Sequence, residues 1–554
     1  MKKLVYPILF ALLGSLVGCE AAVGVSALAA LAGASAGGGR GGSNACAGAT
    51  APVIARAYAD LQQATTDQEI GFGVVASDGP AGSLTYKWDF GDGTTADGSS
   101  VLKKYTRAGN YRITVKASNG CNLSAQAQLD VLVNWKLLTI SWVRRLGITG
   151  FNSGIDRTAI NAVAVDRVGN PIVAGETGCG SCHFTRPDLI SSITTSGTSL
   201  EPDPPALGSE GLLSKFSLTG NRTWIRRLGV LPSNETFHRG ICARTISPSL
   251  IDDTIIIGGS ILECNTTTRT PTRFDDFMLD VPSGFVARLN DSGQPVWSKV
   301  LKTEQVLAVT SASDGGVFVA SWAPSPQSKP IATIRRLSTA GDELWKSVVL
   351  SSAFAEDLKI QAIALSPDKS NLYVVGKKTG STAGQNSAGG TDIFAGKLDS
   401  QGNLIWAKLL GQSSDDDGRS IAVSGDGAIY VVGSCASTAC VFKLASDGAT
   451  VWNKTLDGYT ANAVIIATDG SLYVGGDAVS SLISPETKIF ITRLFPDGSA
   501  AQTQLFGEGR ESLRSLAQSS DKVIYASGVS GSVNFAGVAR VSSDLDGFLM
   551  KLQP

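Results

Sequence analysis

Short apolar runs alternate with Asp/Gly turns from residue 160 to the C-terminus, and this pattern occurs seven times. Each repeat predicts four strands: an apolar run, a strand after an Asp/Gly turn, a strand ending in Lys or Arg plus an apolar residue, and a strand entered through a Gly turn. The third strands end in Lys215-Phe216, Arg288-Leu289, Arg336-Leu337, Lys397-Leu398, Lys443-Leu444, Arg493-Leu494 and Lys551-Leu552. The fourth strands carry Trp224, Trp297, Trp345, Trp406, Trp452 and, in the sixth repeat, Gln502. Repeats of about 45 residues or more built from short strands are typical of a radial β-propeller.

The seventh repeat has no fourth strand after Leu552, whereas Trp142-Val143-Arg144-Arg145-Leu146 nearly duplicates the fourth strand that begins at Trp224. An unpaired strand edge is a liability that folded sheets avoid. We therefore expect residues 136–147 to supply the outer strand of the last blade. The predicted fold is all-β, with a seven-bladed β-propeller over residues 135–554.

The residue pattern of the repeat resembles the bacterial β-propeller repeat family known as SBBP. The closest stretch runs from Gly390-Thr391-Asp392 through Gly402-Asn403-Leu404-Ile405-Trp406 to Gly411. The resemblance implies a propeller fold and an exported location, and it implies no reaction.

A different pattern precedes the propeller. Residues 46–134 contain Trp88-Asp89-Phe90-Gly91-Asp92-Gly93, followed by Tyr105 and Gly109-Asn110-Tyr111. This stretch resembles the polycystic-kidney-disease (PKD) domain, an immunoglobulin-like β-sandwich, which implies a spacer or adhesion module. Trp88 and Phe90 should alternate into the core. Asp89 and Asp92 are expected to bind amides of the Gly-containing turn instead of a metal.

The N-terminus predicts export and a lipid anchor. Lys2-Lys3 precedes an apolar run from Leu4 to Val17, which is the pattern of a signal peptide. Leu16-Val17-Gly18-Cys19 resembles the lipobox of bacterial lipoproteins, which implies a signal peptide over 1–18 and lipidation of Cys19. Residues 19–45 are dominated by Ala, Gly and Ser and predict a flexible tether. We expect an outer-membrane lipoprotein of a bacterial cell envelope, in contact with the membrane only through this anchor.

Charge and histidine content narrow the function. Lys plus Arg total 47 against 48 Asp plus Glu, so the chain has no excess of positive charge that would favour binding of nucleic acid. The chain has only 2 His among 554 residues, which leaves little material for acid–base catalysis. The leading hypothesis is a non-enzymatic binding or scaffold protein without a metal or other cofactor.

Cysteine content predicts disulfides. Beyond Cys19, an even set of eight remains, as expected of an exported chain: Cys46, Cys121, Cys179, Cys182, Cys242, Cys264, Cys435 and Cys440. The expected pairs are Cys46–Cys121, Cys435–Cys440, Cys242–Cys264 and Cys179–Cys182. One alternative stays open, because Cys179-Gly180-Ser181-Cys182-His183 also has the c-type haem attachment pattern. In that case His238 is a candidate second iron ligand, and the protein transfers electrons.

Loop lengths indicate which face of the propeller carries the functional site. The long insertions, residues 176–210, 260–283 and 377–391, all fall between second and third strands, and long loops on a rigid scaffold concentrate binding groups. The connections between blades reach the same face. The candidate residues there are Asp156, Arg157, Arg239, Asp415, Asp416, Asp417, Arg419, Arg510 and Glu511. We expect this face to bind a protein or a glycan; the alternatives are a solvated rim and a propeller hydrolase or lyase that uses these carboxylates.

Overall fold

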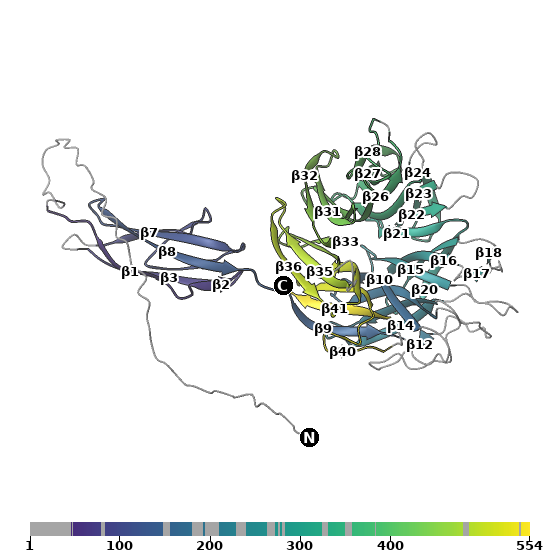
Figure 1. Cartoon of the computed structure of the whole chain (residues 1–554), viewed down its shortest axis with the longest axis horizontal. Coiled ribbons are helices and arrows are strands. Elements are labelled where there is room, and N and C mark those ends of the chain that lie inside the picture. Colours follow the sequence, from purple (N-terminus) through teal and green to yellow (C-terminus); the bar gives the residue numbers. More distant parts are fainter. Residues whose placement is uncertain are drawn as a thin grey trace, which may run out of the picture. The chain divides into compact units, whose positions relative to one another are not determined.

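The computed structural model describes residues 46, 48–78, 83–147, 156–179, 192–193, 210–228, 240–262, 272–274, 277–279, 283–323, 331–349, 357–382, 384–479, 487–541 and 545–554. These residues form strands and turns, and none of them is helical. The chain separates into two compact units, residues 1–136 and 137–554 (Figure 1). The N-terminal 45 residues, including Cys19, lie outside the described part, so the lipid anchor stays a prediction.

The N-terminal unit contains two sheets. One sheet has the order β1 (Val53–Ala59), β3 (Glu69–Ser77) and β6 (Ser100–Lys104). The other has the order β2 (Gln63–Thr65), β8 (Ser124–Asn134), β7 (Gly109–Ser118), β4 (Thr85–Asp89) and β5 (Thr95–Asp97). Side chains from both sheets form a single hydrophobic cluster, as expected of a β-sandwich.

The predicted core residues of this sandwich are confirmed. Trp88 is 0% exposed and Phe90 is 2% exposed, and both rings lie against Phe72, at centroid distances of 5.8 and 5.4 Å. Asp89 accepts the Gly91 amide at 2.9 Å, and Asp92 accepts the Thr94 amide at 3.0 Å. These two carboxylates therefore hold the turn, as the sequence predicted. The expected Cys46–Cys121 disulfide is present as well.

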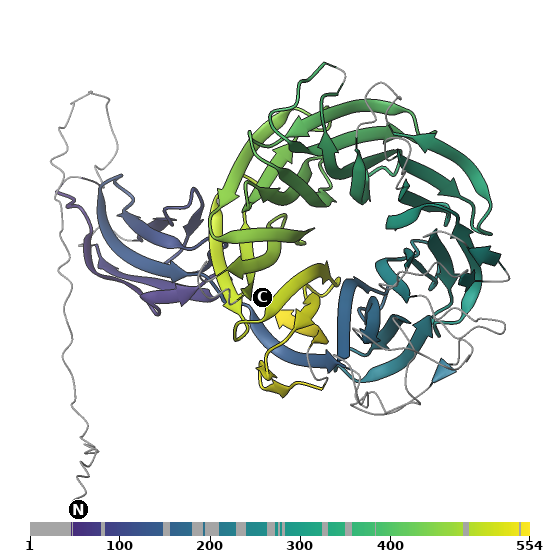
Figure 2. The same cartoon turned by 45° about the vertical axis from the view of Figure 1, so that its right-hand side comes forward.

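The second unit is a ring of blades, which Figure 2 shows most clearly. Among the described residues, seven sheets have four consecutive antiparallel strands from the inside of the ring outward. The sheets are called blades 1 to 7, and their strands are given from inner to outer. Blade 1 has β10 (Asp156–Val165), β11 (Pro171–Cys179), β13 (Glu210–Phe216) and β14 (Arg222–Leu228), and blade 2 has β15 (Gly240–Pro248), β16 (Ile255–Leu262), β19 (Ser283–Leu289) and β20 (Pro295–Leu301). Blade 3 has β21 (Gln305–Ser311), β22 (Val317–Ala323), β23 (Ile331–Leu337) and β24 (Glu343–Val348), and blade 4 has β25 (Lys359–Leu365), β26 (Asn371–Thr379), β27 (Thr391–Asp399) and β28 (Leu404–Leu410).

Blade 5 has β29 (Asp416–Val423), β30 (Ile429–Cys435), β31 (Thr438–Leu444) and β32 (Thr450–Leu456), and blade 6 has β33 (Tyr459–Ile466), β34 (Leu472–Val479), β35 (Thr487–Leu494) and β36 (Ala500–Phe506). Blade 7 has β37 (Glu511–Gln518), β38 (Ile524–Ser530), β41 (Asp546–Gln553) and β9 (Thr139–Leu146).

Shorter strands lie in the connections. The pair β12 (Ser192–Ile193) and β14 extends blade 1 at its outer edge. Two small hairpins, β17 (Thr272–Phe274) with β18 (Phe277–Leu279) and β39 (Asn534–Phe535) with β40 (Val538–Ala539), occur between the second and third strands of blades 2 and 7.

Blade 7 joins the two ends of the propeller. Strand β9 pairs with β41 in antiparallel register, with Trp142 opposite Lys551 and Leu146 opposite Gly547. The N-terminal segment thus supplies the outer strand that the seventh repeat lacks.

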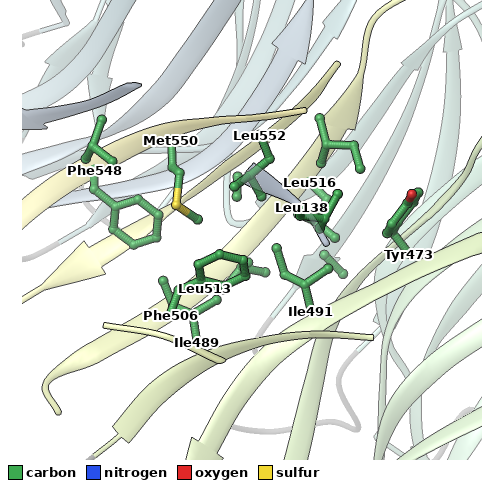
Figure 3. Packing of buried hydrophobic residues seen from close by; sticks show 14 of the residues in the cluster. Leu138, Tyr473, Ile489, Ile491, Phe506, Leu513, Leu516, Phe548, Met550 and Leu552 are labelled. Atoms are coloured by element: carbon green, nitrogen blue, oxygen red, sulfur yellow. The ribbon is translucent and has the colours of Figure 1, made fainter. Parts of the chain in front are cut away.

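Hydrophobic clusters lie between neighbouring blades. The cluster in Figure 3 joins blades 6 and 7: Ile489 and Ile491 come from β35, Leu513 and Leu516 from β37, and Met550 from β41. Similar clusters connect blades 1 and 2, 3 and 4, and 4 and 5. Burial of apolar surface at these blade contacts is the main stabilising contribution.

The repeated Trp and Gly residues hold each blade to the next one. In blade 4, the Trp406 indole N–H donates to the Ser446 carbonyl at 3.2 Å, and a side chain at Gly448 would collide with the Trp406 ring. The same contact recurs at Trp142, Trp224, Trp297 and Trp452, whose indoles donate to Leu218, Asp291, Thr339 and Pro496. In blade 6, Gln502 takes the place of this Trp. The following blade, blade 7, has no turn between its third strand β41 and its fourth strand β9. A Trp at position 502 would therefore have no turn to contact, which explains why blade 6 has Gln instead.

Candidate functional site

Each inner strand carries one β-bulge at the same place. The antiparallel register between the first and second strands shifts by one residue in every blade. The extra residues in blades 1 to 7 are Asn161, Arg244, Leu307, Gln361, Arg419, Asn462 and Arg514, and are called here the bulge ring. Inner strands of neighbouring blades contact one another around the axis, so these residues form a ring. Bulges often re-aim side chains beside functional sites.

A glycine in the second strand makes the bulge possible. In blade 5, a Cβ at Gly433 would overlap the carbonyl oxygen of Asp417, two residues before the bulge residue Arg419. Equivalent glycines in five further blades would meet the equivalent carbonyl: Gly175, Gly259, Gly376, Gly476 and Gly528. The glycine in the second strand therefore marks a bulge. Blade 3 has Ser321 at this position, opposite Val306.

Hydrogen bonds link most of the bulge ring from blade to blade. Arg419 Nη1 donates to Asn462 Oδ1 at 2.6 Å, and Asn462 Nδ2 donates to the Leu513 carbonyl at 2.7 Å in the next blade. Arg514 donates to Asn161, whose amide in turn donates to the Ala243 carbonyl at 3.0 Å. Side-chain bonds across blades of this kind fix the direction of each polar group.

Two aspartates complete this linked arc, which covers blades 4 to 7 and blade 1. Asp417 accepts from Gln361 of the preceding blade and from Arg419 Nε at 3.2 Å. Asp477 accepts from Ser512 Oγ at 3.0 Å and from the Leu513 amide at 2.9 Å. Burial raises the pKa of Asp477. Each bulge residue of this arc and both aspartates thus have at least one hydrogen-bond partner within the protein.

The remaining arc, over blades 2 to 4, is different in charge. Lys359 at the start of β25 lies directly opposite Lys377 near the end of β26. The Lys359 ammonium lies 5.2 Å from the centre of the Trp322 ring in blade 3. Burial, together with the charges of Arg244 and Lys377, lowers the pKa of Lys359. Arg244 Nε donates to Ser260 Oγ at 3.1 Å.

Several predicted face residues belong to inner strands instead of loops, which corrects the sequence-based placement. Asp156 and Arg157 begin β10, Asp416, Asp417 and Arg419 lie in β29, and Glu511 begins β37. The strands extend this far because their first residues still pair with the ends of the second strands. Asp415 precedes β29 and accepts the Thr391 amide at 2.9 Å. Arg239 lies outside the described residues.

Two of these acids are not surface groups at all. Asp416 is 1% exposed and accepts the amides of Gln412 and Ala436 at 2.6 and 3.1 Å. Burial, with the nearby charges of Asp392 and Asp415, raises the pKa of Asp416. Glu511 is 0% exposed, and one carboxylate oxygen accepts three successive amides, those of Glu508, Gly509 and Arg510. Both side chains hold the connection between blades through backbone amides and do not face solvent.

The cysteines divide into three groups. Cys435 and Cys440 form the expected disulfide across the Ala436-Ser437 turn. Cys242 is a buried free thiol, which contradicts the expected pairing with Cys264, and Cys264 lies outside the described residues. Cys242 lies in β15, the inner strand of blade 2, opposite Ser260 in β16. Its sulfur lies 3.5 Å from Asn161 Nδ2. Cys179 ends β11, whereas Cys182, His183 and His238 lie outside the described residues, so haem attachment stays a prediction.

Sequence reasoning missed Lys359, Lys377 and every bulge residue except Arg419. For the bulge residues the signal was present, because each second-strand glycine sits opposite the residue that precedes the bulge. Reading back across the turn from Gly376 would have identified Gln361. Among the described residues, no three His, Cys, Asp or Glu side chains are grouped as a metal site requires. In the same residues, no helix is long and apolar enough to cross a membrane.

Comparison with known proteins agrees with the two units. Residues 49–133 match the family described as PKD domain, and residues 405–435 match the family described as beta-propeller repeat. The PKD1 domain of the Vibrio cholerae metalloprotease PrtV is 26% identical, with 15% of this chain and 98% of that chain covered and a TM-score of 0.14. A protein from Lactobacillus plantarum is 11% identical, with 76% and 96% covered and a TM-score of 0.37. A Hadza microbial sialidase is 10% identical, with 78% of each chain covered and a TM-score of 0.36.

A search of curated proteins gave no match. The chain is thus a PKD domain followed by a β-propeller with an SBBP-type repeat. This combination, together with two disulfides, fits an extracellular or envelope protein with a general binding or scaffold role.

Proposed function

We propose that this protein is a non-enzymatic, lipid-anchored envelope protein that binds a protein or glycan at the end of the propeller where the inner strands begin. The repeated Lys, Arg and Trp residues contact neighbouring turns at the other end of the strands, as Lys443 and Trp452 do at Pro496. These repeated Lys, Arg and Trp residues therefore stabilise the contacts between blades. The bulge ring differs in chemistry from blade to blade while its backbone geometry stays the same.

The observation that carries the proposal is this contrast. Six of the seven bulge positions are polar, and three are Arg: Arg244, Arg419 and Arg514. A structural repeat needs no charge there, because Leu307 occupies the same bulge in blade 3. Polar groups held in fixed directions on rigid strands are the arrangement that gives a binding site its specificity. The lipid anchor at Cys19 would place this site at the bacterial cell envelope, on the outer membrane.

The test uses the purified full-length protein on a glycan array and on an array of envelope and extracellular proteins. The variant Arg514→Ala changes an exposed bulge residue, and the matched control Arg167→Ala changes an exposed Arg in the turn at the opposite end of blade 1. We expect specific binding that Arg514→Ala weakens and Arg167→Ala leaves unchanged. Absence of specific binding on both arrays, or equal loss in both variants, would overturn the proposal.

A further inference from the structure

Three cations lie in the remaining arc, over blades 2 to 4. Lys359 and Lys377 are directly opposite each other on neighbouring strands, so their side chains leave the same face of blade 4. Like charges in this arrangement destabilise a sheet. Arg244 is the bulge residue of blade 2, on an inner strand that contacts β21, which in turn contacts β25, and its charge helps to lower the pKa of Lys359. The fold therefore maintains an unfavourable concentration of positive charge at this place.

The charges of Asp417 and Asp357 offset only part of the positive charge at Lys359. Among the residues that the structure describes, none of Arg244, Lys359 and Lys377 forms an ion pair. Buried cations elsewhere in the propeller have protein partners: Lys215 lies 2.9 Å from Asp166 and Arg145 lies 2.9 Å from Asp546, whereas Arg226 and Arg288 donate to the carbonyls of Ser292 and Gly315. The ammonium groups of Lys359 and Lys377 form neither kind of contact with the residues that the structure describes.

The acids nearest to the cluster are engaged elsewhere or exposed. Asp417 accepts from Gln361 and Arg419. Asp357 is exposed at the entrance to blade 4, and Glu176 interacts with the Cys242 thiol. The described residues thus supply no ion-pair partner for the cluster, and an anion from outside the protein can take this role.

The surroundings indicate the size and polarity of that anion. The half-buried Trp322 ring lies beside Lys359. Most exposed large apolar side chains of the described blades lie on outer strands or turns, among them Val296, Leu344 and Ile405, and Ile331 at the start of β23 is an exception. Protein interfaces need a broad apolar centre, which the described residues around these cations do not form. A small hydroxylated anion, with one carboxylate and one face of C–H groups, fits the arc better.

Building on the proposed function, we propose that Arg244, Lys359 and Lys377 bind the carboxylate of an acidic saccharide, with the sugar ring against Trp322. The guanidinium and the two ammonium groups donate to the carboxylate oxygens, and such charge-assisted bonds are roughly twice as strong as neutral ones.

The experiment measures binding of tetragalacturonate to the purified full-length protein by calorimetry. The comparison ligands are the fully methyl-esterified tetramer, which lacks the charge, and a hexaglutamate peptide, which carries carboxylates without sugar rings. Lys359→Gln and Lys377→Gln remove one charge each. The matched control Lys369→Asn removes a Lys charge from the opposite end of the same blade, at a positive φ that Asn tolerates.

We expect tetragalacturonate to bind, the ester to fail, and each Gln variant to weaken binding about tenfold or more. Lys369→Asn should bind as the parent does. No binding of tetragalacturonate, equal affinity in all variants, or tighter binding of the peptide than of the saccharide would overturn the inference. The proposed function fails separately, because its test asks whether Arg514→Ala removes array binding of any ligand.

Discussion

Arg145 and Asp546, from opposite ends of the propeller sequence, form an ion pair at 2.9 Å with both side chains 0% exposed. Arg145 belongs to β9 and Asp546 begins β41, so the pair lies within the blade that closes the ring. Arg145 also donates to the carbonyls of Ser530 and Ser532 at 3.2 and 2.9 Å. Such a pair is costly to break from one side, because the remaining charge stays buried.

Asp546→Asn should therefore destabilise the propeller by about 3–5 kcal/mol. The double variant Arg145→Met/Asp546→Asn removes the stranded charge and should recover part of the loss. Thermal unfolding of the full-length protein measures both. If the single variant unfolds at the parental temperature, the pair does not secure the closure of the ring.

The Trp contact between blades predicts an asymmetric result. Trp406→Ala removes an indole that packs on Gly448 and donates to Ser446, and we expect a loss of about 3 kcal/mol. Gln502→Ala, at the equivalent place in blade 6, should change stability by less than about 0.5 kcal/mol. Chemical denaturation compares the two variants. Equal losses would contradict the assignment of the Trp residues to contacts with the following blade.

The bulge glycines should not tolerate a methyl group. Gly433→Ala places a Cβ against the Asp417 carbonyl, so the bulge must shift, at a cost of about 1–3 kcal/mol. Gly425→Ala in the turn of the same blade meets no atom within 4 Å and is the matched control. A Gly433→Ala protein as stable as the control would show that the bulge is not constrained in this way.

Blade 3 contains an acid-sensitive cluster. Burial opposes ionisation of Glu304, but hydrogen bonds from Arg335, Ser321 and Lys346 outweigh it and lower its pKa to about 2. Because the folded-state pKa lies below the ordinary value of 4.5, the ionised form stabilises the fold above about pH 4.5. This contribution is lost as the pH falls toward 2.

Glu304→Gln should accordingly be less stable than the parent at pH 7, and the difference should shrink as the pH falls from 4.5 toward 2. Unfolding curves at several pH values measure it. The matched control Glu343→Gln changes a largely exposed acid that also contacts Arg335 at 2.9 Å, and its effect should be small throughout. A pH-independent difference for Glu304→Gln would contradict the assignment.

Cys242 should be chemically inert in the folded protein. Burial and the neighbouring Glu176 charge raise the pKa of this thiol, and the thiolate is the reactive form. Iodoacetamide at pH 8, followed by peptide mass analysis, should label Cys242 only after denaturation. Detection of a Cys242–Cys264 cross-link, or rapid labelling of Cys242 in the native state, would contradict the structure.

Periodic patterns determined much of this architecture without coordinates. The repeat indicated radial blades, and Trp88 and Phe90 indicated the core of the sandwich. The isolated strand that begins near Trp142 indicated which segment supplies the outer strand of the last blade. The Cys46–Cys121 and Cys435–Cys440 pairs also followed from the chain alone. Each of these depends on local propensity or on a pairing between strands that the repeat itself identifies.

Only the tertiary structure decided which charges support the fold and which remain for a ligand. Asp416 and Glu511 read as face residues in the sequence, yet their burial and backbone partners depend on how successive blades meet. Lys359 and Lys377 carry no local signature, and the bulge signal at Arg244 does not reveal its neighbours, because the juxtaposition of the three residues arises from a sheet register and from the curvature of the ring. Contacts between residues distant in sequence are set by packing, and no pattern within one repeat encodes them.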